Sequence, residues 1–212
     1  VQIEELGTDA MSNKIAVEFN AKSPTLDIVL IRPLNETKLF GLNGWALDLH
    51  PYVDKDAGVD LKDFVDATIQ SLTYEGKLIG LPVNTEHQIL YYRKDILEKH
   101  GLKVPTTLDE MMAVAAKIHD PANGFYAVVN RGKKNIAVTQ FSSYLHSFGG
   151  SFNEGNKALI DTPQAIAAYK FYTDLLRKYG PPGITNFSWP EAAALMAQGK
   201  AGMFTDADAI YL

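Results

Sequence analysis

The chain has 212 residues and a formal net charge of −5, with 46% hydrophobic and 21% charged residues. This balance is typical of a folded protein that buries a core, and it excludes a mainly disordered chain. The acidic balance argues against a nucleic-acid-binding surface. No apolar run approaches the ~20 residues of a membrane-spanning helix. Because the chain contains no cysteine, disulfides, thiolate catalysis and cysteine-ligated zinc are excluded.

The first third of the chain is predicted to mix strands and helices. Residues 1–6 alternate apolar and polar side chains, which is the pattern of a half-buried strand. Residues 8–20 place apolar side chains on one helical face, and residues 60–71 indicate a short helix. Residues 26–31 are almost all aliphatic, which is typical of a strand buried on both faces of a parallel sheet.

Residues 74–102 combine turn, strand and helix signals. In chain order they predict a turn at 75–77, a strand ending at Pro82, a polar gap at 84–88, a strand at 89–92 and a helix from 94 to Gly101. Many α/β proteins share this order, so it indicates a structural class.

The second half of the chain alternates helices with strands. Helices are predicted at 107–118, 162–178 and 190–198, and strands at 125–129 and 201–205. Thr107 and Thr162 are candidate N-caps, and the proline after Thr162 suits the first helical position. This alternation predicts the α/β class with parallel sheets.

Motifs for metal, cofactor or nucleophilic chemistry are absent from the sequence. The five histidines include no pair at the i, i+4 spacing of a helical zinc site. There is no Gly-x-Ser-x-Gly elbow, phosphate-binding loop or dinucleotide fingerprint. The sequence therefore predicts no catalytic residue, no metal and no cofactor.

Five segments carry a resemblance to a known family, and they occur in that family's order and spacing. They are YEGKLIGLPVNTEHQILYYRKDILEKHGL at 74–102, FGGSFN at 148–153, LLRKYGPPG at 175–183, NFSWPE at 186–191 and QGKAGMFTD at 198–206. With this set the chain resembles the extracellular solute-binding proteins that feed sugars to ABC importers (carbohydrate-binding family 1). Within that family it looks most similar to the sorbitol/mannitol-like branch.

The resemblance implies a fold and a domain division. The fold is the two-lobed α/β architecture of type II periplasmic binding proteins, with parallel-rich sheets. The first lobe would cover residues 1–106 and the second 107–204, while 205–212 would begin the return toward the hinge. Because members of the family run to ~400 residues, well beyond one ordinary domain, we expect a chain truncated at both ends and without its signal segment.

The resemblance also implies a function. A sugar or polyol would be captured in the interlobe cleft by hinge closure and delivered to the permease subunits of an ABC importer. The location would be periplasmic or extracellular, with lipid anchoring left open. The complete protein would be a monomer, whereas a truncated chain would self-associate or bind its sugar far more weakly, because its sheets lack strands. The particular ligand and permease are also left open.

Six candidate ligand-binding residues occupy positions that match the family's motifs. They are Glu86, Arg131, Asn153, Trp189, Asp206 and Asn35. Charged side chains would pair with hydroxyl groups, and the aromatic ring would cover the apolar face of the sugar. Four have a structural alternative, with Trp189 as a core aromatic, Glu86 and Arg131 as surface charges, and Asn153 as a turn residue.

Two other classes of function stay open at this point. A carbohydrate-active hydrolase would use Glu86 and Asp206 as paired carboxylates about 5–10 Å apart across the scissile bond. A metal-capturing binder would need His, Asp or Tyr side chains that converge in the cleft.

Overall fold

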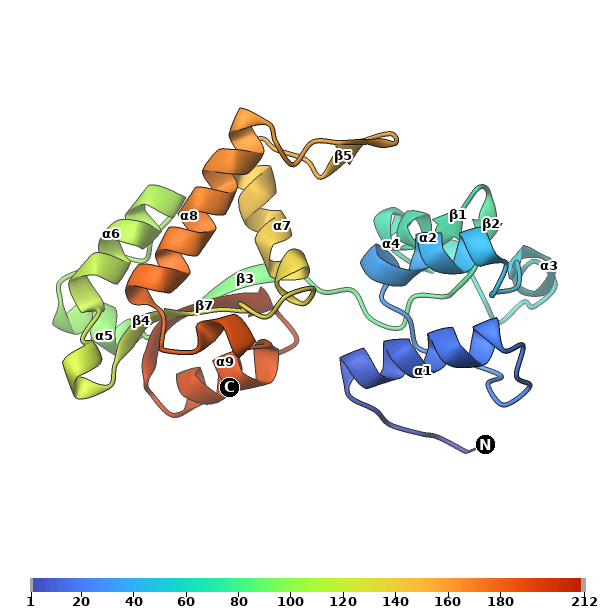
Figure 1. The fold of residues 1–212 in the computed structure, drawn as a ribbon, viewed down its shortest axis with the longest axis horizontal. Helices are drawn as coiled ribbons and strands as arrows, with labels where there is room; N and C mark the ends of the chain where they lie inside the picture. The colour runs from blue at the N-terminus through green and yellow to red at the C-terminus, as the bar shows by residue number, and fades with distance from the viewer. Residues whose placement is uncertain (1, 211–212) are drawn as a thin grey trace. The chain divides into compact units, whose positions relative to one another are not determined.

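The computed structural model describes residues 2–210, except for the side chains of Thr8 and Asp9. It divides the chain into two compact units, Val1–Thr85 and Glu86–Leu212, which are considered one at a time (Figure 1). The predicted first lobe ends at residue 106, whereas the boundary between the compact units follows Thr85. Residues 86–106 belong to the second unit because they supply a strand of its sheet and a helix whose Leu97 is buried in its core.

The first unit is mostly helical. Its elements are α1 (Thr8–Asn20), α2 (Pro33–Asn43), α3 (His50–Val53), a 3₁₀ turn at Leu61–Asp63, α4 (Asp66–Ser71), β1 (Thr73–Tyr74) and β2 (Lys77–Leu78). The predicted helix at 8–20 is confirmed, and the helical region at 60–71 is split into the 3₁₀ turn and α4. The predicted turn at 75–77 joins β1 to β2. Glu75 and Gly76 are both at positive φ, a backbone conformation that matches a two-residue hairpin turn to the right-handed twist of its strands.

An aromatic cluster forms one core of the first unit. The rings of Phe19, Phe40 and Trp45 lie with their centroids 5.5–5.8 Å apart. Phe40 is contributed by α2, a helix that the sequence analysis did not predict. Pro33 occupies its first turn, and the carboxylate of Glu36 accepts hydrogen bonds from the backbone and the guanidinium of Arg32. These local interactions fix the start of α2.

Two strands predicted in the first unit are wrong. Residues 2–6 are exposed and irregular, and residue 1 lies outside the described residues. Residues 26–31 form no strand, and Ile28 and Leu30 are 91% and 61% exposed. A buried parallel strand needs a strand on each side. Among the described residues of this unit, only β1 and β2 pair, and they pair with each other.

The second unit is built around a three-stranded sheet. Its elements are β3 (Gln88–Tyr92), α5 (Lys94–Lys99), α6 (Leu108–Ile118), a 3₁₀ turn at Pro121–Asn123, β4 (Tyr126–Val129), α7 (Ala137–Ser147), β5 (Asn153–Glu154), β6 (Lys157–Ala158), α8 (Pro163–Tyr179), a 3₁₀ turn at Ile184–Asn186, α9 (Trp189–Ala197) and β7 (Ala201–Ala207). The strand order is β3-β7-β4, in which β7 runs parallel to β4 and antiparallel to β3. The sheet is therefore mixed.

Helices cover both faces of this sheet (Figure 1). Val128 and Met203 face the larger cluster, which includes side chains from α6, α7 and α8. The next residues along the strands, Val129 and Phe204, face α9 on the other side. This alternation follows from the period of two in a strand, and it explains why β4 and β7 are apolar on both faces.

The helices and strands predicted for this unit are confirmed within one or two residues, but α7 and the short strands β5 and β6 were missed. Thr107 and Thr162 are N-caps, since their hydroxyl groups accept hydrogen bonds from the backbone N–H groups of Glu110 and Ala165. None of the described helices is long and apolar enough to span a membrane.

Candidate functional site

The polar residues of interest gather at one edge of the second unit's sheet. The parallel strands β4 and β7 end at this edge, and the antiparallel β3 begins there, with Gln88 opposite Ala207. We call it the carboxyl edge and define it by Asn130, Arg131, Thr205, Asp206 and Ala207. In open α/β sheets, ligands bind outside the carboxyl ends of parallel strands.

Arg131 and Asp206 form a bidentate ion pair at the carboxyl edge. Nε of Arg131 donates to Oδ2 of Asp206 at 2.7 Å, and Nη2 donates to Oδ1. Asp206 is completely buried, and its Oδ1 also accepts the backbone N–H of Ala207. The side chain of Arg131 is 14% exposed, so it is largely but not completely buried. A fully buried carboxylate therefore holds this partly exposed arginine in one orientation.

Asn130 continues the contact between β4 and β7 beyond the last paired residues. Its Oδ1 accepts the backbone N–H of Thr205 at 2.9 Å and the hydroxyl of Thr205 at 3.1 Å. Its Nδ2 donates to the hydroxyl oxygen of Tyr144 at 3.0 Å. Burial raises the pKa of Tyr144, so this phenol stays protonated. At the carboxyl edge, hydrogen bonds to the Asn130 side chain thus take the place of backbone pairing between β4 and β7.

Tyr172 supports the same loop from α8. Its hydroxyl group donates to the backbone carbonyl of Arg131 at 2.6 Å, and burial raises its pKa well above the ordinary value. The sequence analysis missed Asn130, Tyr144, Tyr172 and Thr205. Asn130 and Thr205 carried a signal, because each is a polar residue that follows apolar strand residues, whereas the two tyrosines look like ordinary core residues of helices.

The loop after Arg131 is joined to the start of α9. The backbone N–H groups of Gly132 and Lys133 both donate to the carbonyl of Phe187, at 3.1 and 2.9 Å. Glycine is required at 132 because a Cβ atom there would lie 2.2 Å from the carbonyl oxygen of Ile184. This close approach gives a physical reason for the glycine that follows Arg131.

Trp189 is the first residue of α9, two positions after Phe187. α9 runs back toward the start of β7, so its first turn lies at the end of the sheet where β7 finishes. A reciprocal pair of hydrogen bonds between Ser188 and Glu191 caps this turn. Trp189 is 45% exposed, so its ring presents apolar surface to solvent rather than filling the core.

Glu86 precedes β3 and is exposed. The neighbouring His87 is bonded to Asp208, since its backbone N–H donates to Oδ1 at 3.1 Å and its ring lies 3.0 Å from Oδ2. These hydrogen bonds from His87 lower the pKa of the Asp208 carboxyl group. They extend the pairing of β3 with β7 and bring the chain at Glu86 to the carboxyl edge. Glu86, Arg131 and Asp206 all belong to the second unit.

Asn153 lies in a hairpin of the second unit, outside the carboxyl edge, and Asn35 belongs to the first unit. Asn153 is exposed in the β5–β6 hairpin, where its Nδ2 donates to the carbonyl of Gly155 at 2.7 Å. The hairpin follows the C-terminal end of α7 (Figure 1), whose 11 residues span about 16 Å. This geometry fits the turn-residue alternative. Asn35 is an exposed residue in the first turn of α2 in the first unit.

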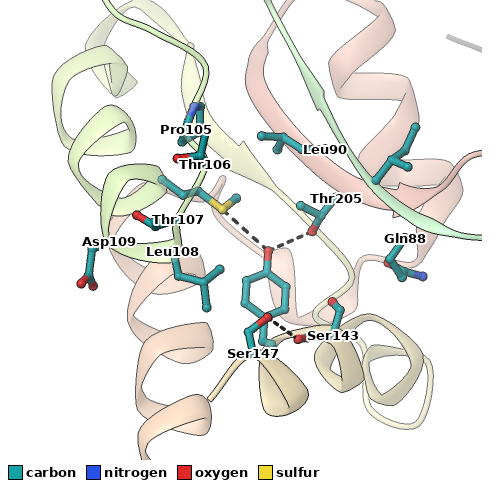
Figure 2. A pocket seen from close by; sticks show the side chains of 13 residues that line it. Gln88, Leu90, Pro105, Thr106, Thr107, Leu108, Asp109, Ser143, Ser147 and Thr205 are labelled. Atoms are coloured by element: carbon teal, nitrogen blue, oxygen red, sulfur yellow. Dashed lines mark hydrogen bonds between the residues drawn. The ribbon is translucent and has the colours of Figure 1, made fainter. Parts of the chain in front are cut away.

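A cavity of about 470 Å³ opens on the α6 and α7 side of the second unit (Figure 2). Its lining residues come from β3, the start of α6, α7 and β7, and they are Gln88, Ile89, Leu90, Pro105, Thr106, Thr107, Leu108, Asp109, Met111, Ser143, Tyr144, Ser147 and Thr205. None of the six predicted site residues lines it. Among the side chains that the structure describes, no group of three or more His, Cys, Asp or Glu could hold a metal ion.

Comparisons with known proteins identify the family of the chain. Residues 1–211 match the bacterial extracellular solute-binding protein family. A mannitol-binding protein from Pseudomonas aeruginosa is 28% identical over 209 residues, which are 95% of this chain and 47% of that protein. A solute-binding protein from Agrobacterium vitis S4, solved with bound D-mannitol, is 31% identical with a TM-score of 0.84, and the match covers 98% of this chain and 51% of that one.

A third match is a solute-binding protein from Agrobacterium radiobacter K84, solved in complex with ribitol. It is 29% identical with a TM-score of 0.89, and the match covers 97% of this chain and 52% of that one. The chain thus spans about half the length of these relatives and has the type II periplasmic-binding-protein fold. It belongs to the bacterial extracellular solute-binding protein family.

Proposed function

We propose that this chain is part of the solute-binding component of an ABC importer and that it captures a sugar or sugar alcohol. One observation carries the proposal. An oriented, partly exposed Arg131 at the carboxyl edge is joined by an exposed Trp189 at the start of α9, at the same end of the sheet. The chain's relatives include a mannitol-binding protein and structures with bound mannitol and ribitol. Binding a polyol requires these two surfaces, because its hydroxyl groups need polar partners and its C–H groups need an apolar cover.

The residues at the carboxyl edge would divide the work of binding. Arg131 would donate hydrogen bonds to ligand hydroxyl groups, and Glu86 would accept them. Trp189 would cover the carbon chain or ring face of the ligand. Asp206 is buried and would act through Arg131 rather than touch the ligand. Asn153 and Asn35 stay predictions that rest on the family resemblance alone.

The family resemblance extends the proposal to the whole protein. It would work outside the cytoplasm, in the periplasm or at the cell surface, with a lipid anchor as one means of retention. It would be a monomer that closes around its hinge on binding and passes the ligand to permease subunits. The 212-residue chain by itself would self-associate, which light scattering tests, or bind more weakly, which calorimetric titration tests.

The hydrolase alternative gains no support. It needs one accessible carboxylate on each side of the scissile bond, but Asp206 is fully buried and committed to Arg131. The relatives are named as binding proteins. Turnover of a chromogenic glycoside by the purified chain would instead support the hydrolase alternative.

A thermal-shift screen tests the proposed function. A ligand that binds only the native state raises the midpoint of unfolding by mass action. We expect mannitol, ribitol or a related polyol to raise the midpoint, with Arg131→Gln abolishing the shift. Polyols and sugars that all leave the midpoint unchanged, while a ligand from another class raises it, would contradict the proposal.

A further inference from the structure

We infer that the pairing of Arg131 with Asp206 makes the site selective for uncharged polyhydroxy ligands and excludes their carboxylate counterparts. The inference rests on the proposed function and adds a specificity determinant to it. Asp206 would thereby determine which ligands the site accepts according to their charge, although it touches no ligand itself.

The geometry of the pair provides the first step. An arginine that binds a carboxylate or phosphate usually presents two parallel N–H groups to it. In Arg131, Nε and Nη2 are already occupied by the two oxygens of Asp206. The second hydrogen of Nη2 and the two hydrogens of Nη1 take no part in this pair, so they can donate hydrogen bonds to ligand hydroxyl groups, while the positive charge that would favour an acid is already matched by Asp206.

Charge provides the second step. Asp206 is 0% exposed, so water screens its carboxylate poorly. An anionic ligand that approached Arg131 would meet a guanidinium whose positive charge this buried carboxylate already compensates, so it would gain little attraction, and the nearby like charge would oppose its binding. A neutral ligand meets no such repulsion. Exclusion of this kind, by a charge placed against the wrong ligand, is a general route to specificity.

The orientation of the pair is also fixed from the side of Arg131. Tyr172 donates to its backbone carbonyl, and Gly132 is bonded to Phe187. Arg131 is therefore held at both its backbone and its guanidinium, and swinging away from Asp206 to meet an acid would break the bidentate pair.

The experiment compares ligands that differ by one charge. The intact 212-residue chain is titrated with mannitol and mannonate, and with ribitol and ribonate, by calorimetry or ligand-observed NMR. Asp206→Asn keeps the side-chain shape but removes the negative charge, so Arg131 becomes an uncompensated cation. We expect the wild-type chain to prefer each polyol over its acid, and Asp206→Asn to reduce this preference at least about tenfold through stronger binding of the acid.

Asp95→Asn is the matched control. Asp95 accepts the same bidentate fork from Arg93, with distances of 2.7 and 2.5 Å, but it lies on α5 beyond the opposite end of β3. The substitution makes the same change in net charge and should leave the polyol-to-acid ratio unaltered. An equal effect of both substitutions would show that the selectivity comes from the protein's total charge, and the inference would fall.

The outcomes separate this inference from the proposed function. A wild-type chain that binds polyols and acids equally, or an Asp206→Asn variant that folds and keeps the wild-type ratio, overturns the inference and leaves the function standing. Binding of neither class overturns both. Should circular dichroism show Asp206→Asn to be unfolded, the wild-type ratio decides, because equal or stronger binding of mannonate contradicts the inference without any variant.

Discussion

The two units of the chain differ in how completely their apolar segments are covered. In the second unit, β7 lies between two strands and under helices on both faces, and Met203 and Phe204 are fully buried. In the first unit, the equally apolar residues 26–31 form no strand, and Ile28 and Leu30 are exposed. The comparison teaches that an aliphatic run indicates a potential to be buried, while neighbouring strands decide whether it becomes a strand.

The largest expected effect contrasts one apolar residue from each of these two segments, buried Phe204 and exposed Ile28. Phe204→Ala should destabilise the second unit by about 3–5 kcal/mol, because it leaves a cavity between β7 and α9. Ile28→Ala should change the stability of the first unit by no more than about 0.5 kcal/mol, since the side chain is already in solvent. Urea unfolding followed by circular dichroism measures both. A large loss of stability from Ile28→Ala would show that residues 26–31 are buried in solution.

The next effect compares the buried ion pairs of the two units. Asp206→Ala should cost about 3 kcal/mol, since it leaves Arg131 without its buried partner. Glu36→Ala should cost less, about 1–2 kcal/mol, because the side chain of Arg32 is 34% exposed and water can replace the carboxylate. The same unfolding experiment tests the ranking. A larger cost for Glu36→Ala would reverse the comparison.

The two tryptophans separate stability from binding. Trp189→Ala should weaken polyol binding by about 1–3 kcal/mol and leave the unfolding midpoint nearly unchanged, because the ring is 45% exposed. Trp45→Ala should instead lower the stability of the first unit, because its ring packs against Phe19 and Phe40. Calorimetric titration and thermal unfolding of both variants make the test. Unaltered affinity in folded Trp189→Ala would remove this residue from the site.

The smallest effect concerns two His–Asp contacts, one in each unit. Hydrogen bonds from His50 and from His87 lower the pKa of Asp48 and of Asp208 respectively. A carboxyl group whose pKa is lower in the folded state stabilises the protein above its unfolded pKa of about 3.9, and this contribution is lost as the pH falls through the folded value. NMR titration should place both carboxyl groups below that value. In Asp208→Asn, the acid-induced loss at the carboxyl edge should disappear, and an unchanged acid profile would contradict the assignment.

Much of the second unit could be predicted because its signals are local. The N-caps Thr107 and Thr162 act on N–H groups three residues away, and the strand patterns at β4 and β7 are visible in short windows. The candidate site was only partly predictable. Arg131 and Asp206 were proposed from motif resemblance, but their pairing joins residues 75 positions apart. The supporting tyrosines, Tyr144 and Tyr172, carry no local sign that their hydroxyl groups reach the carboxyl edge.

The sequence by itself therefore determined the α/β class, most helix and strand positions of the second unit, and the family whose motifs the chain carries. Only the tertiary structure decided that β7 pairs with strands of opposite direction, that residues 26–31 form no strand, and that Asp206 is buried against Arg131. The physical reason is the range of the interactions. Caps, turns and helical hydrogen bonds join residues a few positions apart, whereas sheet pairing and a buried ion pair depend on which distant segments are packed together.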